Sequence, residues 1–106
     1  MIYCFDIDET ICASIGIDYN TAIPFQERLD FINELFEMGH TIKMYTARGS
    51  KTGMDLTQFT KEQLDSWGLK YHELVMGKPF ADIYVDDKAL NSEVFFSENL
   101  PISGEN

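Results

Sequence analysis

Positively charged residues are scarce in this chain of 106 residues. Eight Lys and Arg stand against eighteen Asp and Glu, which gives a formal net charge of −10 at neutral pH. A surface this acidic repels phosphate backbones and anionic lipids, so nucleic acid and membranes are not expected as partners. An anionic small substrate would need a metal ion or a few well-placed cations to reverse the field locally.

Cysteine is nearly absent, and long apolar runs are missing. Cys4 and Cys12 are too few and too close together for a disulfide framework, and Cys4 lies in an apolar segment where a reduced thiol behaves as a small hydrophobe. No apolar run approaches the ~18 residues of a membrane span, and a first strand that begins at Ile2 leaves no signal peptide. We therefore expect a soluble, cytoplasmic protein.

The chain does contain short apolar runs that alternate with segments of helical periodicity. With 44% hydrophobic residues it can build one domain with a single core, expected at 1–100 with a loose tail at 101–106. The expected strands are 2–5, 41–45, 71–75 and 83–85, with 94–96 a candidate fifth. The expected helices are 25–38, with Pro24 in its first turn, and 57–67, ended by Gly39 and Gly68; residues 12–22 are expected to form a loop or small flap. This alternation favours an α/β fold with a single Rossmann-like open parallel sheet flanked by helices.

Polar side chains follow each of the four expected strands. In chain order they are Asp6 and Asp8, then Thr46 and Arg48, then Lys78, and finally Asp86 and Asp87. Ligands of open α/β sheets collect outside the carboxyl ends of the strands. We therefore expect these residues to form one site.

This set of residues suits phosphoryl transfer. Carboxylates from two strands are the ligands of a hard divalent cation, with Mg²⁺ the default because it also keeps waters and phosphate oxygens. A hydroxyl (Thr46) and an ammonium (Lys78) suit an anion with several acceptor oxygens. An aspartate at such a site can attack phosphorus, and a second carboxylate two residues on can protonate the leaving oxygen and activate water.

Four segments resemble the motifs of the haloacid dehalogenase-like (HAD) phosphatases. YCFDIDET resembles the first motif, IKMYT the second, GKP supplies the lysine of the third, and IYVDD resembles the fourth. They occur in order and span residues 1–87. TARG and the string KYHELVMGKPFADIYVDDKALN are also similar to small HAD proteins associated with surface-polysaccharide biosynthesis.

The resemblance implies roles for the catalytic residues. Asp6 matches the nucleophile, and Asp8 matches the general acid/base whose backbone carbonyl also ligates Mg²⁺. Thr46 would hold the phosphoryl oxygens, and Lys78 would neutralise nucleophile and phosphate together. Position 9 is Glu where many members carry Gly, although the family's C-terminal-domain phosphatases also carry Glu there.

The remaining site residues are assigned in the same way. Besides Asp6 and Asp8, the expected metal ligands are Asp86 and Asp87. Asp87 is expected to bind the metal directly with Asp86 beside it, and the alternative is that the two exchange these roles. The expected substrate-binding set is Thr46, Ala47, Arg48 and Lys78. For Arg48 two interpretations stay open: contact with the substrate's leaving group, or an ion pair with surface acids.

The expected function is a Mg²⁺-dependent phosphomonoesterase that acts on a small phosphorylated metabolite, with a sugar phosphate favoured. The gaps 11–40 and 47–70 are too short for a cap domain, so a macromolecular substrate is an alternative, and a catalytically silent scaffold is another. A signalling receiver domain is disfavoured, because it carries its phospho-accepting Asp after the third strand, where this chain has Lys78. The open site and the aromatic pair in the candidate strand 94–96 also predict a homo-oligomer, a dimer or tetramer.

Overall fold

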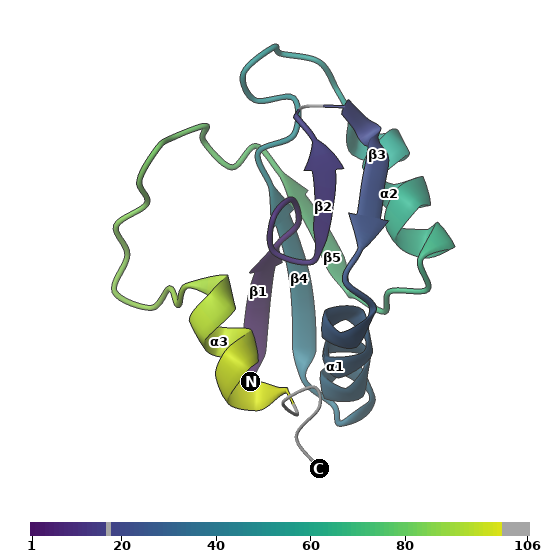
Figure 1. The fold of residues 1–106 in the computed structure, drawn as a ribbon, viewed down its shortest axis with the longest axis vertical. Coiled ribbons are helices and arrows are strands. Elements are labelled where there is room, and N and C mark those ends of the chain that lie inside the picture. The colour runs from purple at the N-terminus through teal and green to yellow at the C-terminus, as the bar shows by residue number, and fades with distance from the viewer. Residues whose placement is uncertain (17, 101–106) are drawn as a thin grey trace.

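Three parallel strands form the central sheet. The computed structural model describes residues 1–16 and 18–100. Strands β1 (Ile2–Asp6), β4 (Thr41–Thr46) and β5 (Glu73–Met76) pair in the order β1-β4-β5 (Figure 1). The register places Tyr45 beside both Asp6 and Val75, so the strands end at a common edge. This confirms an α/β fold with an open parallel sheet.

Two helices follow the strands as the periodicity predicts. Helix α1 (Gln26–Glu37) buries Leu29, Ile32 and Leu35, and helix α2 (Thr57–Ser66) buries Leu64. Both helices end at a glycine with positive φ, +94° at Gly39 and +75° at Gly68. The residue after each glycine donates its N–H back to a carbonyl of the last turn, which satisfies an otherwise unpaired acceptor.

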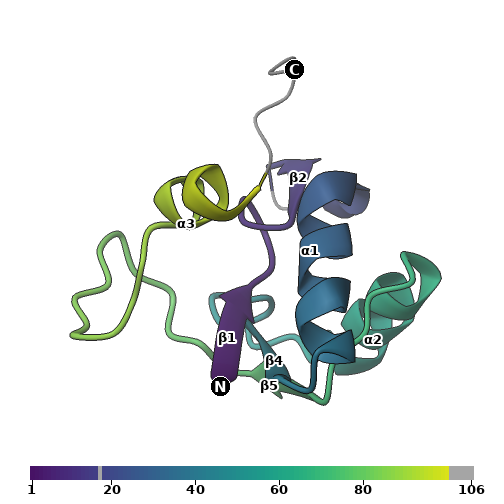
Figure 2. The same ribbon diagram turned by 90° about the horizontal axis from the view of Figure 1, so that it is seen from below.

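The sheet is covered on one face. Figure 2 shows α1 and α3 (Ser92–Asn99) on the same side of the strands. Phe5, Ile42 and Met44 are buried, whereas Ile2 is 68% exposed and Cys4 is exposed. Because side chains alternate along a strand, β1 buries only every second residue. Cys4, expected to behave as a small hydrophobe within its apolar segment, is therefore exposed instead of packed in the core.

The predicted loop or flap at 12–22 is a β-hairpin. Strands β2 (Cys12–Ile15) and β3 (Asp18–Pro24) pair antiparallel, with Cys12 opposite Pro24. Pro24 thus ends a strand instead of entering the helix, and Phe25 is the N-cap residue of α1.

The expected strand at 83–85 does not form. Residues 77–91 leave the end of β5 as a loop that arcs outward and returns to α3 (Figure 1). Ile83 is 78% exposed and Val85 94% exposed. A run of three apolar residues bounded by acids is too short to show the alternation of apolar and polar side chains that predicts a strand. Within the described residues, β1 pairs with β4 alone.

Residues 94–96, the candidate fifth strand, belong to helix α3. The side chain of Asn91 accepts the Glu93 N–H at 2.9 Å and caps its first turn. Phe95 and Phe96 both pack against Phe5 and Phe31, and Phe96 is only 2% exposed. The aromatic surface on which the homo-oligomer was expected is therefore absent from α3, and oligomerisation stays a prediction without that support.

Substitution within α3 should distinguish the helix from a strand. Phe96→Ala should lower the free energy of unfolding by about 3–5 kcal/mol, because it leaves a cavity among three aromatic rings. Val94→Ala should cost less than about 1 kcal/mol, since Val94 is 47% exposed. On a strand the two residues would share one face. If urea denaturation showed that the two variants lose similar amounts of unfolding free energy, the helix would be contradicted.

The expected tail 101–106 lies outside the described residues. Among those described, no helix is both long and apolar enough to cross a membrane.

Candidate active site

Asp6 and Lys78 meet at the common edge of the sheet. Asp6 is the last residue of β1, and the Lys78 ammonium lies 3.6 Å from its Oδ1 atom. The backbone N–H of Lys78 donates to the Thr46 carbonyl at 3.0 Å, which fixes the lysine beside the end of β4. The structure thus brings together Asp6, Thr46 and Lys78, as the sequence predicts.

The Asp6 carboxylate is partly shielded from water. Its side chain is 35% exposed, and Thr10 donates its hydroxyl to Oδ2 at 3.3 Å. Burial raises the pKa of Asp6, while the Lys78 ammonium and the Thr10 hydroxyl act in the opposite direction. A partly desolvated carboxylate beside one cation is a stronger nucleophile than a hydrated one, because less water must be removed before it attacks.

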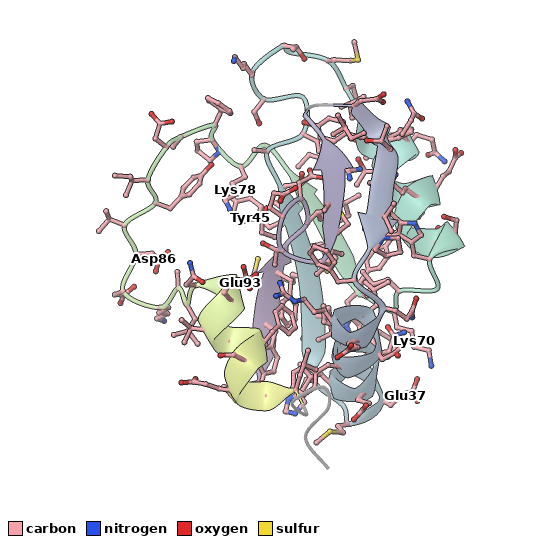
Figure 3. All side chains as sticks on the ribbon, in the orientation of Figure 1. Glu37, Tyr45, Lys70, Lys78, Asp86 and Glu93 are labelled. Atoms are coloured by element: carbon pink, nitrogen blue, oxygen red, sulfur yellow. The ribbon has the colours of Figure 1, made fainter. Side chains whose placement is uncertain are left out.

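Aromatic rings hold the Lys78 side chain. Its Nζ atom lies 4.3 Å from the centre of the Tyr84 ring and 5.7 Å from that of Tyr45. Figure 3 shows Lys78 and Tyr45 together at the end of the sheet, with Asp86 on the outer loop. Tyr84, which was expected in a strand, instead turns back over the lysine and donates its hydroxyl to the Pro79 carbonyl.

A tight turn links Asp6 to the hairpin. Thr10 and Ile11 both donate their N–H to the Ile7 carbonyl, and Glu9 adopts a φ of +62°. Glycine adopts this left-handed conformation most easily, which explains physically why Gly suits this position. Glu9 is exposed.

Asp8 is bound by Arg48. The guanidinium Nε and Nη2 atoms donate to Asp8 Oδ2 and Oδ1, each at 2.9 Å. The Arg48 side chain is fully buried and that of Asp8 is 26% exposed. Arg48 therefore forms an ion pair, but with Asp8 of the expected site and not with a separate surface acid. Contact of Arg48 with a leaving group stays a prediction.

Thr46 is buried in the structure. It is 1% exposed, and its hydroxyl oxygen accepts the Arg48 N–H at 3.0 Å. Ala47 follows directly and joins Thr46 to Arg48. Contact of Thr46 and Ala47 with a substrate stays a prediction.

Asp86 and Asp87 are not brought to the other acids. Both are exposed on the loop 77–91, where Asp86 accepts the Lys88 N–H at 2.7 Å. Across residues 1–16 and 18–100 no group of three or more His, Cys, Asp or Glu is arranged to hold a metal ion. The expected four-acid cluster therefore does not form, because it depended on a fourth strand ending at Asp86.

The hollows of the described surface include one near Arg48 and one along α1. One of about 230 Å³ lies where the loop between β4 and α2 meets the end of β5, with Arg48, Asp55 and Met76 in its wall. The loop is tightly closed there, since a Cβ on Gly49 would lie 2.1 Å from the Met54 carbonyl oxygen. The larger, about 550 Å³, lies along α1 and contains none of the predicted site residues.

Comparison with known proteins supports the fold. No family model matches the chain, and no curated protein matches it. A crystal structure of an MCSG target from Vibrio cholerae is similar, with a TM-score of 0.78 and 25% sequence identity over 91% of this chain and 87% of that one.

Proposed function

We propose that this chain is a phosphomonoesterase of the HAD type that transfers the phosphoryl group of a small phosphorylated metabolite to Asp6. The observation that carries the proposal is the placement of Asp6 at the end of β1 with the Lys78 ammonium 3.6 Å from its carboxylate. The four motifs in order support it. A sugar phosphate, as used in surface-polysaccharide biosynthesis, is the favoured substrate class.

The proposed reaction has two steps. An Asp6 oxygen forms a bond to phosphorus while the ester P–O bond breaks, and the leaving oxygen takes a proton from Asp8. In the second step water attacks the phosphorus, its proton passes to Asp8, and the bond to Asp6 breaks. The products are an alcohol and inorganic phosphate. Lys78 balances the negative charge of Asp6 and the transferring group in both steps.

Mg²⁺ is the proposed cofactor. It is usually held by one or two carboxylates together with waters and substrate phosphate, and here Asp6 and the Asp8 carbonyl would hold it. Bound there, it would neutralise charge on the transferring phosphoryl group. Asp87 or Asp86 would join only in a different conformation of the loop 77–91.

Magnesium should stabilise the protein through Asp6. At about ten times its Kd, a ligand of the folded state adds about 1.4 kcal/mol, which raises the Tm of a domain this size by roughly 5–10 °C. EDTA should remove the increase, and Asp6→Asn should abolish it. The measurement is thermal unfolding at matched ionic strength in NaCl, because any cation screens a net charge of −10.

The loop acids provide the companion variant. Asp87→Asn should keep the Mg²⁺ shift if Asp6 and Asp8 suffice, and should lose it if the loop closes on the metal. An identical shift with NaCl, or no shift at all, would remove the metal from the proposal.

Phosphate release from a substrate panel tests the function itself. The panel holds sugar phosphates, a phosphopeptide and a 5′-phosphorylated oligonucleotide, each with and without Mg²⁺. Release from a sugar phosphate, lost in Lys78→Met, is the expected result. Turnover of the phosphopeptide alone would favour the macromolecular alternative, and no release from any member would favour the silent scaffold.

A further inference from the structure

Arg48 occupies a junction between three parts of the fold. Its buried guanidinium lies 4.5 Å from the centre of the Tyr19 ring, on the hairpin, and 6.0 Å from that of Phe59, on α2. The Nη1 atom is 3.4 Å from the Thr60 hydroxyl. The Tyr19 carbonyl accepts a hydrogen bond from the Gln63 side chain of α2 at 2.8 Å. This bond ties the hairpin to α2 and keeps the Tyr19 ring beside the Arg48 guanidinium.

A buried guanidinium requires a well-placed anion. In the described chain Asp8 is the carboxylate that pairs with Arg48, and it does so through both oxygens. A planar fork that binds two oxygens fixes the plane of the carboxylate as well as its distance. Lysine, with its single nitrogen, would fix neither to the same degree.

We propose that Arg48 is a positioning residue that holds Asp8 as the proton acceptor for the water that cleaves phospho-Asp6. This inference rests on the proposed function. Both Asp8 oxygens accept hydrogen bonds from Arg48, so the carboxylate is oriented to receive a proton, which is its task in the second step. Each Asp8 oxygen keeps a second lone pair that Arg48 does not use, and this lone pair can carry the proton that Asp8 gives in the first step and receives in the second.

With p-nitrophenyl phosphate as the substrate, formation and cleavage of phospho-Asp6 should respond differently to loss of Arg48. The nitrophenolate of p-nitrophenyl phosphate leaves without a proton, so formation of phospho-Asp6 from it does not need Asp8 as a donor. Cleavage of phospho-Asp6 still needs Asp8 to accept the proton of the attacking water. Arg48→Met should thus give a stoichiometric burst of nitrophenolate followed by steady-state turnover at least about tenfold below that of the wild type.

Rapid-mixing kinetics with p-nitrophenyl phosphate and Mg²⁺ is the test. Arg48→Lys should show a steady-state rate between those of Arg48→Met and the wild type. If Arg48→Met does not fold, the comparison of Arg48→Lys with the wild type is the test. Lys70→Met, which removes a surface cation paired with Glu37, controls for the change in net charge and should match the wild type.

Three results would overturn the inference. Equal steady-state rates in Arg48→Met and the wild type would mean that Asp8 needs no such partner. A proportional fall in burst and steady state would show a purely structural role. Both leave the proposed function intact. A wild-type protein that releases neither nitrophenolate nor phosphate from any member of the substrate panel would overturn the proposed function, and the role of Arg48 with it.

Discussion

Asp6→Asn should abolish phosphate release, with turnover reduced by a factor on the order of 10⁴ or more. The amide cannot form the acyl phosphate, and it supplies no negative charge to Lys78 or to a metal ion. The measurement is phosphate release with the best substrate of the panel, at enzyme concentrations high enough to detect residual turnover. Substantial activity in this variant would rule out covalent transfer to Asp6.

The same variant should remain folded, which makes the loss of activity interpretable. Burial raises the pKa of Asp6 above its unfolded value, so the ionised carboxylate disfavours the folded state. That penalty is fully present above the folded pKa and disappears as the pH falls below the unfolded pKa. In metal-free buffer at pH 7, Asp6→Asn should therefore be at least as stable as the wild type.

Asp8→Asn should show the opposite effect on stability. It leaves the fully buried Arg48 guanidinium facing a neutral amide. Removing one partner of a buried ion pair costs about 3–5 kcal/mol, and the low end applies because Asp8 is 26% exposed. The Tm should fall by at least about 10 °C. Thermal and urea unfolding measure the loss, while turnover falls because the acid/base is gone.

A double-mutant cycle separates the pair from its surroundings. Asp8→Asn combined with Arg48→Met should recover most of the lost stability, since no buried charge is left unpaired. Asp82→Asn, on the exposed loop, should change the free energy of unfolding by less than about 0.5 kcal/mol. Additive losses in the double variant would show that the ion pair contributes nothing to folding.

The sequence predicts those elements whose local pattern is long enough to specify them. In β4 the residues Ile42, Met44 and Thr46 alternate with half-buried neighbours, and Gly39 and Gly68 mark two helix ends unambiguously. The runs at 83–85 and 94–96 are three residues long, so neither a period of two nor one of 3.6 can be recognised in them. The capping Asn91 was the available signal for α3.

Some of the site residues could likewise be predicted from the sequence, and others could not. Asp6 and Lys78 were predictable because each follows a strand of a parallel sheet, and such ends share an edge. The position of Asp86 and Asp87 away from the other acids was not predictable, because it results from the failure of residues 83–85 to form a strand. The Asp8–Arg48 pair depends on the path of the loop after β4 and on the hairpin that brings Tyr19 over the guanidinium. Both are tertiary features with no local sequence pattern.

The central claim is that Asp6 carries the phosphoryl group, and the phosphoenzyme itself tests it most directly. The wild type is mixed with p-nitrophenyl phosphate and Mg²⁺, quenched in acid during turnover, digested, and analysed by mass spectrometry. We predict one phosphoryl group on the peptide that contains Asp6, absent from Asp6→Asn. Turnover without that modified peptide, or a phosphoryl group on another residue, would contradict the account.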